Sequence, residues 1–192
     1  MEFRLRIVAS MLALAFMAGA IGGSPSLSAA EAGGKACRLY ADAKPKNLSK
    51  QHARSAVICL INRRRVKHGH ERLKRNKQLQ RAAQRHSERM EGGNCFAHQC
   101  YGEASLDGRL RDVGYLSGGV SSWMCAENIA WGLKRHGTPR ATVNGWMQSP
   151  PHRANILNAS FRDVGVGFAD GTPGNAHANG GVYTADFGVR RG

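Results

Sequence analysis

Three side chains that could bind a metal ion or a polar ligand lie far apart in this 192-residue sequence: His98, Glu127 and His152. Each stands where a predicted helix or strand meets a loop, which is typical of a site assembled by folding. Two imidazoles and one or two carboxylates would suit zinc or another divalent cation and leave a position for water. A polar cleft held by hydrogen bonds is the alternative. The residues alone leave both interpretations open.

His152 has the most definite local setting of the three. Ser149, Pro150 and Pro151 precede it, and a serine N-cap with proline in the first turn is typical of a helix start. The positive end of that helix disfavours imidazolium, so we expect a neutral ring that can act as a ligand or acceptor. Ser149 could also act as a nucleophile with His152 as its base, but its position before the helix favours the capping role.

His86 is a fourth histidine with a different interpretation. It shares one face of a predicted helix with Leu79, Ala82 and Met90, and a histidine on such a face is more often a hydrogen-bonded core residue than a ligand. The sequence has no G-x-S-x-G elbow, no H-E-x-x-H motif and no glycine-rich phosphate loop. The common hydrolase and nucleotide-binding signatures are therefore absent.

Hydrophobic periodicity predicts the elements that must position these residues. Apolar positions recur at helical spacing in the first half, whereas later segments alternate with a period of two. The glycine- and asparagine-rich stretch 170–181 between the last two strands predicts an antiparallel hairpin with a long connection. Helices that cover an antiparallel sheet, an α+β fold, are the expected solution. We expect helices at 49–69, 76–92 and 105–114 and from Pro139 and Pro150 onward, and strands at 125–131, 163–169 and 182–189.

The first 30 residues have the pattern of an export signal. Arg4 and Arg6 precede an apolar run at 7–21, and small residues precede a predicted cleavage site near Ala30. The apolar run is shorter than a membrane-spanning helix requires, although an uncleaved anchor is the alternative. We expect a secreted or periplasmic protein of one domain, with no transmembrane segment in the mature chain.

The chain is strongly basic, with a net charge of +15. Outside the cell this charge would favour anionic lipids or cell-envelope polymers. Solvated helix faces are the simpler explanation, since lysine and arginine fill exposed helix positions by propensity. We expect no nucleic-acid partner.

Five cysteines lie beyond the export signal, where oxidising conditions permit disulfides. We expect Cys37 to pair with Cys59, which would tether the N-terminal leader. Cys95 and Cys100 flank a short loop and could pair with each other, or one of them could reach Cys125. An odd number leaves one thiol free in a monomer, and no C-x-x-C spacing indicates a zinc-thiolate site.

The sequence contains four ordered motifs: FAHQC at 96–100, AENIAWG at 126–132, GWMQSPPHRANIL at 145–157 and DVGVGFA at 163–169. With these motifs it resembles the bacterial CAP superfamily, the SCP-like relatives of cysteine-rich secretory proteins, antigen 5 and pathogenesis-related protein 1. The resemblance covers roughly residues 55–189 and implies a three-layer α-β-α sandwich with a central antiparallel sheet and a polar cavity. Together with the export signal, it divides the chain into a signal peptide at 1–30, a leader at 31–54 and a CAP domain at 55–192.

The resemblance also implies a site. In the family, two histidines and two acids line the cavity, and several members bind zinc or another divalent cation there. Carried over by motif, these are His98, Glu127 and His152, with Glu103 as the second acid and Asp107 as the alternative.

The function that the resemblance implies is less definite, because relatives bind lipids, signal or act in defence. We expect a non-enzymatic binding module whose ligand is a lipid or a cell-envelope component. A metal-assisted, peptidase-like hydrolase with Glu127 or Glu103 as general base is one alternative, since a metal-bound water needs such a base. The other is a protein whose basic surface binds anionic envelope polymers or lipids.

Overall fold

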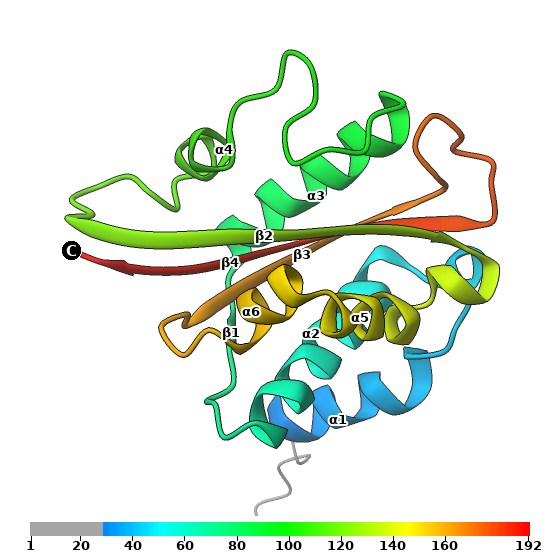
Figure 1. The fold of residues 1–192 in the computed structure, drawn as a ribbon, viewed down its shortest axis with the longest axis horizontal. Helices are drawn as coiled ribbons and strands as arrows, with labels where there is room; N and C mark the ends of the chain where they lie inside the picture. Colours follow the sequence, from blue (N-terminus) through cyan, green and yellow to red (C-terminus); the bar gives the residue numbers. More distant parts are fainter. Residues whose placement is uncertain (1–28) are drawn as a thin grey trace, which may run out of the picture.

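A four-stranded sheet lies between two layers of helices in the computed structural model, which describes residues 29–192 (Figure 1). The predicted export segment, except its last two residues, lies outside the described residues. The α+β fold and its α-β-α layers are those expected. The elements are α1 (Ala29–Tyr40), η1 (Pro45–Asn47), α2 (Lys50–Lys67), β1 (Lys74–Arg75), α3 (Lys77–Gly92), α4 (Leu106–Asp112), β2 (Ser122–Leu133), η2 (Lys134–Gly137), α5 (Pro139–Gln148), α6 (Pro150–Leu157), β3 (Asp163–Asp170) and β4 (Gly180–Arg191).

The strand order is β1-β3-β4-β2, which places β4 inside the sheet and β2 at one edge. β4 pairs antiparallel with both β2 and β3, so the predicted hairpin around 170–181 is confirmed. One short strand adds a parallel pair to the expected antiparallel sheet. Lys74 and Arg75 of β1, at the edge opposite β2, pair in parallel with β3. Two residues are too short a run to give a recognisable period in the sequence.

Large and small residues alternate along β3, which lets α3 pack closely on one side of the sheet. Val164, Val166 and Phe168 point into the main apolar core on the side of α2, α5 and α6. Gly165 and Gly167 face α3 instead. A Cβ at Gly165 would lie 2.1 Å from the backbone nitrogen of Gln80, so only glycine lets the backbone of α3 lie directly on β3.

Opposite layers of helices cover the two faces of the sheet (Figure 1). α2, α5 and α6 contact one face, which we call the apolar face, and α3 and α4 contact the other, which we call the polar face. On the apolar face, buried residues such as Ile61, Trp146 and Phe187 form one large cluster. On the polar face, two smaller apolar clusters lie apart from each other.

The N-terminal segment that was predicted as a leader contains a helix. α1 packs on α2, and the predicted disulfide between Cys37 and Cys59 joins them. Cys37 is 1% exposed, so this end of the chain belongs to the core. Cys95 pairs with Cys100, which decides between the alternatives for these residues, and Cys125 is the free thiol.

Candidate functional site

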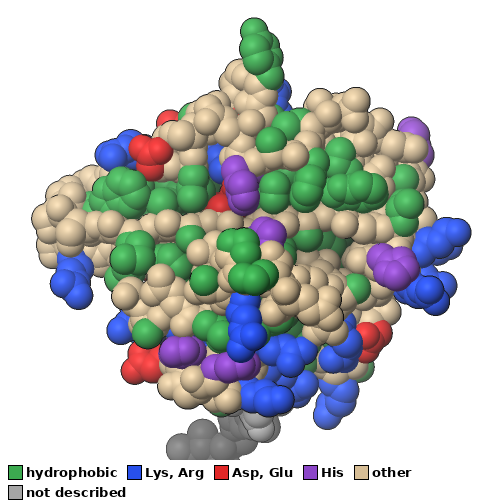
Figure 2. Space-filling model, viewed as in Figure 1, with side chains coloured by type: hydrophobic (Ala, Val, Ile, Leu, Met, Phe, Trp, Pro, Cys, Tyr) green, Lys and Arg blue, Asp and Glu red, His purple; other side chains and the backbone are tan. Residues whose placement is uncertain are grey.

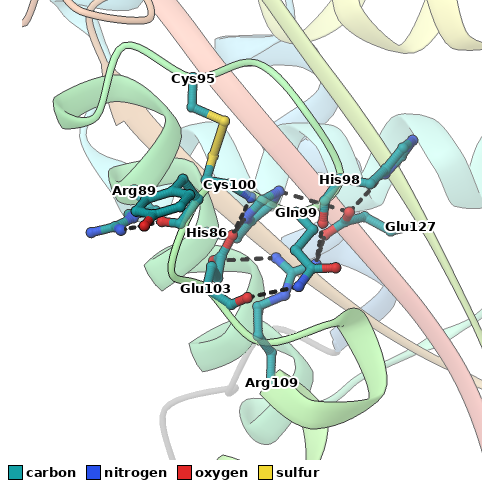
Figure 3. The surroundings of a disulfide bond; sticks show 10 residues. His86, Arg89, Cys95, His98, Gln99, Cys100, Glu103, Arg109 and Glu127 are labelled. Atoms are coloured by element: carbon teal, nitrogen blue, oxygen red, sulfur yellow. Dashed lines mark hydrogen bonds and ion pairs between the residues drawn. A yellow bond between two sulfur atoms is a disulfide. The ribbon is translucent and has the colours of Figure 1, made fainter.

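Glu127 lies at the centre of a buried group of charged side chains on the polar face of the sheet (Figure 3). It sits in the middle of the edge strand β2 and is 7% exposed. Its Oε1 lies 2.8 Å from His98 Nδ1, and its Oε2 accepts a hydrogen bond of 2.9 Å from Arg109 Nη2. Both oxygens of this carboxylate are therefore engaged by basic groups.

His98 lies in a short loop that a disulfide closes. Cys95 and Cys100 bracket this loop, and Arg109 Nη2 donates a second hydrogen bond, of 3.1 Å, to the His98 carbonyl (Figure 3). The hydrogen bond with Glu127 raises the pKa of His98 above its usual value, although partial burial and the charge of Arg109 oppose this. Glu127 therefore both orients this imidazole and favours its protonated form.

Glu103 contacts the imidazole of His86, the histidine that the sequence assigns to the core. Both of its carboxylate oxygens lie 2.9 Å from His86 Nδ1, and one accepts a hydrogen bond from the Cys100 backbone N–H at 3.1 Å. Arg109 Nη1 lies 3.7 Å from the other. His86 has no exposed surface, so its assignment as a buried, hydrogen-bonded histidine is confirmed. It also belongs to the charged group around Glu127.

Asp186 adds a third acid that the sequence reasoning did not identify. It stands opposite Glu127 in the register between β2 and β4 and has no exposed surface. Neither of its carboxyl oxygens has a hydrogen-bond partner among the described residues. Burial raises the pKa of Asp186 well above its usual value, and the nearby negative charge of Glu127 adds to this effect. The polar cluster, as we call His86, Glu103, Arg109, Glu127 and Asp186, therefore contains one acid whose neutral form is favoured by its surroundings.

The pKa of Glu127 moves in the opposite direction. Its burial alone would raise the pKa, but the hydrogen bond with His98 and the charge of Arg109 outweigh that cost and lower it. The pKa values of two carboxyl groups paired across neighbouring strands therefore move in opposite directions, because only Glu127 contacts basic groups.

His152 approaches the site from the helical layer on the apolar face. Its Nδ1 lies 2.8 Å from Ser149 Oγ, and its carbonyl accepts a hydrogen bond from the buried Asn128 amide at 3.0 Å. Asn155 Nδ2 donates to Asn128 Oδ1 at 2.9 Å and to the Glu127 carbonyl at 3.4 Å, which fixes α6 against β2. Ser149 is the N-cap residue of α6, as expected, but its side chain makes no capping hydrogen bond.

The pKa of His152 is lowered, in the direction expected from its sequence position. The main cause is burial, and the second is the charge of His98. The two histidines therefore lie near each other. Each uses Nδ1 for a hydrogen bond within the protein, so Nε2 is the atom that each can offer to a ligand.

A pocket of about 400 Å³ opens beside His152, between the edge of β2 and α5. Its walls are largely aromatic and aliphatic, including Phe96, Ile129, Trp131 and Trp146. Trp146 Nε1 donates to the Ile129 carbonyl at 3.0 Å, which holds α5 against the strand. In the same view as Figure 1, Figure 2 shows hydrophobic side chains above and below β2, with histidines among them near the middle of the face. We call this cavity the edge pocket.

The donor set does not fit a divalent cation as it is arranged here. Within residues 29–192, no three His, Cys, Asp or Glu side chains are grouped so that they could hold a metal ion. Arg109 lies between Glu103 and Glu127 and supplies the positive charge there. The imidazoles of His98 and His152 offer two nitrogens, fewer than the three protein ligands of a typical open zinc site. Zinc or another divalent cation stays a prediction from the resemblance.

The structure places the predicted residues in three ways. His98 and Glu127 contact each other directly, Glu103 reaches them through Arg109, and His152 faces them from the opposite helical layer. Asp107, the alternative acid, lies outside the polar cluster, because its carboxylate accepts a hydrogen bond from Ser105 Oγ at 2.6 Å and faces solvent.

Sequence reasoning missed Arg109, although a signal was present. Leu106, Leu110 and Val113 define the buried face of α4, and Arg109 falls on that same face at helical spacing. A basic residue in such a position needs a buried acid as its partner. Asp186 also had a signal in the sequence. Thr184, Asp186 and Gly188 alternate with apolar residues along the predicted strand, so they share the face opposite the apolar core.

Comparisons with known proteins agree with this architecture. A Bacillus subtilis protein, YkwD, which is described as uncharacterized, is 34% identical over 131 residues, covering 68% of this chain and 45% of that protein. The uncharacterized membrane protein YlbC of the same organism is 34% identical over 111 residues, covering 58% of this chain and 30% of that protein. The chain thus spans less than half the length of these relatives.

Solved structures share the fold. An extracellular protein of Bacillus anthracis that contains an SCP domain aligns over 76% of this chain and 42% of its own, with 27% identity and a TM-score of 0.61. An outer surface protein of Borrelia burgdorferi aligns over 70% of this chain and 90% of its own, with 18% identity and a TM-score of 0.58. The model of the cysteine-rich secretory protein family, CAP, matches residues 59–187, which is more than half of the sequence. The chain therefore belongs to the CAP family.

Proposed function

We propose that this chain is an extracellular binding module that takes the apolar part of an amphipathic ligand into the edge pocket. The observation that carries this proposal is the pocket itself. Its volume of about 400 Å³ falls within the range of small-molecule sites, which are concave and mostly apolar with a few polar groups. Phe96, Trp131 and Trp146 supply apolar surface, and Ser149 and His152 supply the polar end.

The polar groups beside the pocket favour a ligand with a hydrogen-bonding head group. His152 and His98 direct Nε2 away from their internal partners, and the pKa of His98 is raised, so one of the two favours a positive charge. A lipid or another cell-envelope amphiphile with an acidic head group matches this combination of an apolar cavity and imidazole donors.

Three observations support an extracellular location. The predicted export signal precedes the described residues, two disulfides are formed, and the Bacillus anthracis relative is described as extracellular. Disulfides persist in oxidising compartments. Among residues 29–192, no helix is both long and apolar enough to cross a membrane.

Binding is favoured over metal-assisted hydrolysis because neither acid expected to act as general base is free. Glu127 is engaged by His98 and Arg109, and Glu103 is engaged by His86. A hydrolase that activates water needs a base within hydrogen-bond reach of that water, whereas both acids already bind internal cations or imidazoles. Binding of anionic polymers by the basic surface stays a prediction, and the salt dependence of binding distinguishes it from binding in the edge pocket.

Dodecanoate, a fatty acid with an apolar chain and an acidic head, is a suitable probe of the edge pocket. Trp131 and Trp146 line the pocket, so we expect tryptophan fluorescence to change on binding. Gly145 also lines it, and a Cβ built there meets nothing within 4 Å. Gly145→Leu should therefore place a side chain in the pocket and weaken dodecanoate binding at least tenfold.

The matched control is Gly92→Leu, at the end of α3, where an added Cβ also meets nothing within 4 Å. It should bind dodecanoate like the original protein. Equal binding by both leucine variants would contradict the proposal. A steep loss of affinity between about 0.05 and 0.5 M salt would indicate binding by the basic surface instead, because salt screens exposed charges.

A further inference from the structure

Arg109 has an unusual position for a basic residue. It is 6% exposed, and it reaches from α4 into the space between the sheet and the loop that carries His98. Its Nη2 lies 2.9 Å from Glu127 Oε2, and its Nη1 lies 3.7 Å from Glu103 Oε1 (Figure 3). The guanidinium thus stands between the two acids that the family resemblance offers as metal ligands.

We propose that Arg109 is the resident cation of this site and that it prevents Glu103 and Glu127 from binding a divalent metal ion. Both oxygens of Glu127 are engaged, one by Arg109 and one by His98. A metal ion that bound Glu127 Oε2 would have to displace a guanidinium whose positive charge is permanent near neutral pH. The displaced charge would remain close to the metal and repel it, since Arg109 is held within α4.

The second acid gives a metal ion no better access. Glu103 contacts His86 Nδ1 with both oxygens and also accepts from the Cys100 backbone N–H. Together with Arg109, these contacts satisfy the carboxylate before any ligand arrives. His86 Nε2 also lacks a hydrogen-bond partner among the described residues, but it has no exposed surface and lies 3.8 Å from Glu127 Oε1. The accessible donors are the Nε2 atoms of His98 and His152, and two are fewer than the three protein ligands typical of open zinc sites.

This proposal concerns the polar cluster and does not depend on the edge pocket. The pocket walls contain neither Arg109, Glu103 nor Glu127. Dodecanoate binding and metal binding can therefore succeed or fail separately, and a chelator such as EDTA should leave dodecanoate binding unchanged.

Zinc titration by calorimetry, followed by metal analysis, tests the proposal on the purified protein. The comparison variant is the double substitution His98→Ala and His152→Ala, which removes the two accessible nitrogen donors from the site. We expect the original protein and the double variant to retain the same amount of zinc, within twofold in affinity. One equivalent of zinc that the original protein holds at least tenfold more tightly than the double variant would overturn the proposal.

Arg109→Gln provides the second test. It removes the positive charge but keeps a side chain that can donate to one carboxylate. We expect this variant to gain zinc affinity at least tenfold, and the gain should disappear when Glu127→Gln is added. A folded Arg109→Gln protein with unchanged zinc affinity would contradict the proposal. If the variant does not fold, the comparison between the original protein and the histidine double variant still decides the matter.

Discussion

The two faces of the central sheet are built by different physical means. On the apolar face, Ile61, Trp146 and Phe187 belong to one continuous hydrophobic cluster. On the polar face, the polar cluster separates two smaller hydrophobic clusters. Both faces are buried, because β4 lies inside the sheet and helices cover both sides of it.

Neighbouring residues of β4 show the contrast most directly. Phe187 and Asp186 are both fully buried, yet they point to opposite faces. Phe187 removes apolar surface from water, which stabilises the fold. Asp186 loses its hydration without gaining a hydrogen bond within the described residues, which is costly. Burial on the apolar face therefore stabilises the fold, whereas burial of acids on the polar face offsets part of that stabilisation.

Phe187→Ala should have the largest effect on stability. Removal of a fully buried phenyl ring from the main cluster typically costs about 4 kcal/mol. Urea denaturation followed by circular dichroism measures this change in the free energy of unfolding. The control is Phe96→Ala, because Phe96 is 47% exposed and should change stability by about 0.5 kcal/mol or less. Similar losses in both variants would show that the main cluster of the apolar face contributes no more to stability than an exposed position does.

Arg109→Met tests the electrostatic balance of the polar face. Removal of one partner from a buried ion pair leaves Glu103 and Glu127 without their cation and should cost about 3 kcal/mol at pH 7. The loss should shrink toward pH 4, since unpaired carboxylates become protonated there.

The control for Arg109→Met is Arg111→Met on the same helix. Arg111 and Asp107 form an ion pair of 3.8 Å that is largely exposed to solvent. Such pairs contribute about 0.5 kcal/mol or less, so this variant should unfold almost like the original protein. Equal losses in the two variants would show that the buried ion pairs of Arg109 contribute no more to stability than the exposed pair of Arg111.

Asp186→Asn should change how stability depends on pH. The raised pKa of Asp186 means that the folded state retains a proton which the unfolded state loses above about pH 4. Stability from this group is therefore present below its unfolded pKa and is lost as the pH rises toward the folded pKa. The slope is about 1.4 kcal/mol per pH unit. Asparagine cannot ionise, so the variant should gain stability relative to the original protein as the pH rises. Parallel curves for the two proteins would contradict this.

The smallest expected effect concerns the two histidines at the edge of the sheet. NMR titration should give His98 a pKa above 6.5 and His152 a pKa below it, because only His98 is bound to Glu127. Glu127→Gln should lower the pKa of His98, since it removes the negative charge but keeps the shape. Identical titration of both histidines would show that the two sides of β2 do not differ electrostatically.

Much of the fold follows from local patterns in the sequence. The Asn76 side chain accepts hydrogen bonds from two backbone N–H groups at the start of α3, and the Thr138 side chain accepts one at the start of α5. The alternation of β3 and β4 was also visible, because apolar side chains on one face recur with a period of two. These signals are short in range, so they survive in a single sequence.

The composition of the site was harder to predict. The motifs identified His98, Glu127 and His152, but they could not show that Arg109 and Asp186 lie beside Glu127. Pairing across the sheet depends on register, and the approach of α4 depends on tertiary packing. An arginine on a buried helix face was the local signal, and its acidic partner could be found only in the folded chain.

The hydrogen bonds that fix α5 and α6 to β2 also affect how the molecule behaves among its own copies. An edge strand usually exposes free backbone groups that can pair with a strand of another molecule and begin aggregation. Here Trp146 donates a hydrogen bond to the Ile129 carbonyl, and Asn155 donates one to the Glu127 carbonyl. Both carbonyls lie in the middle of this edge. A second strand could not form a continuous ladder along β2. The side chains that position the two helices therefore also help to keep a concentrated solution of the protein from associating edge to edge.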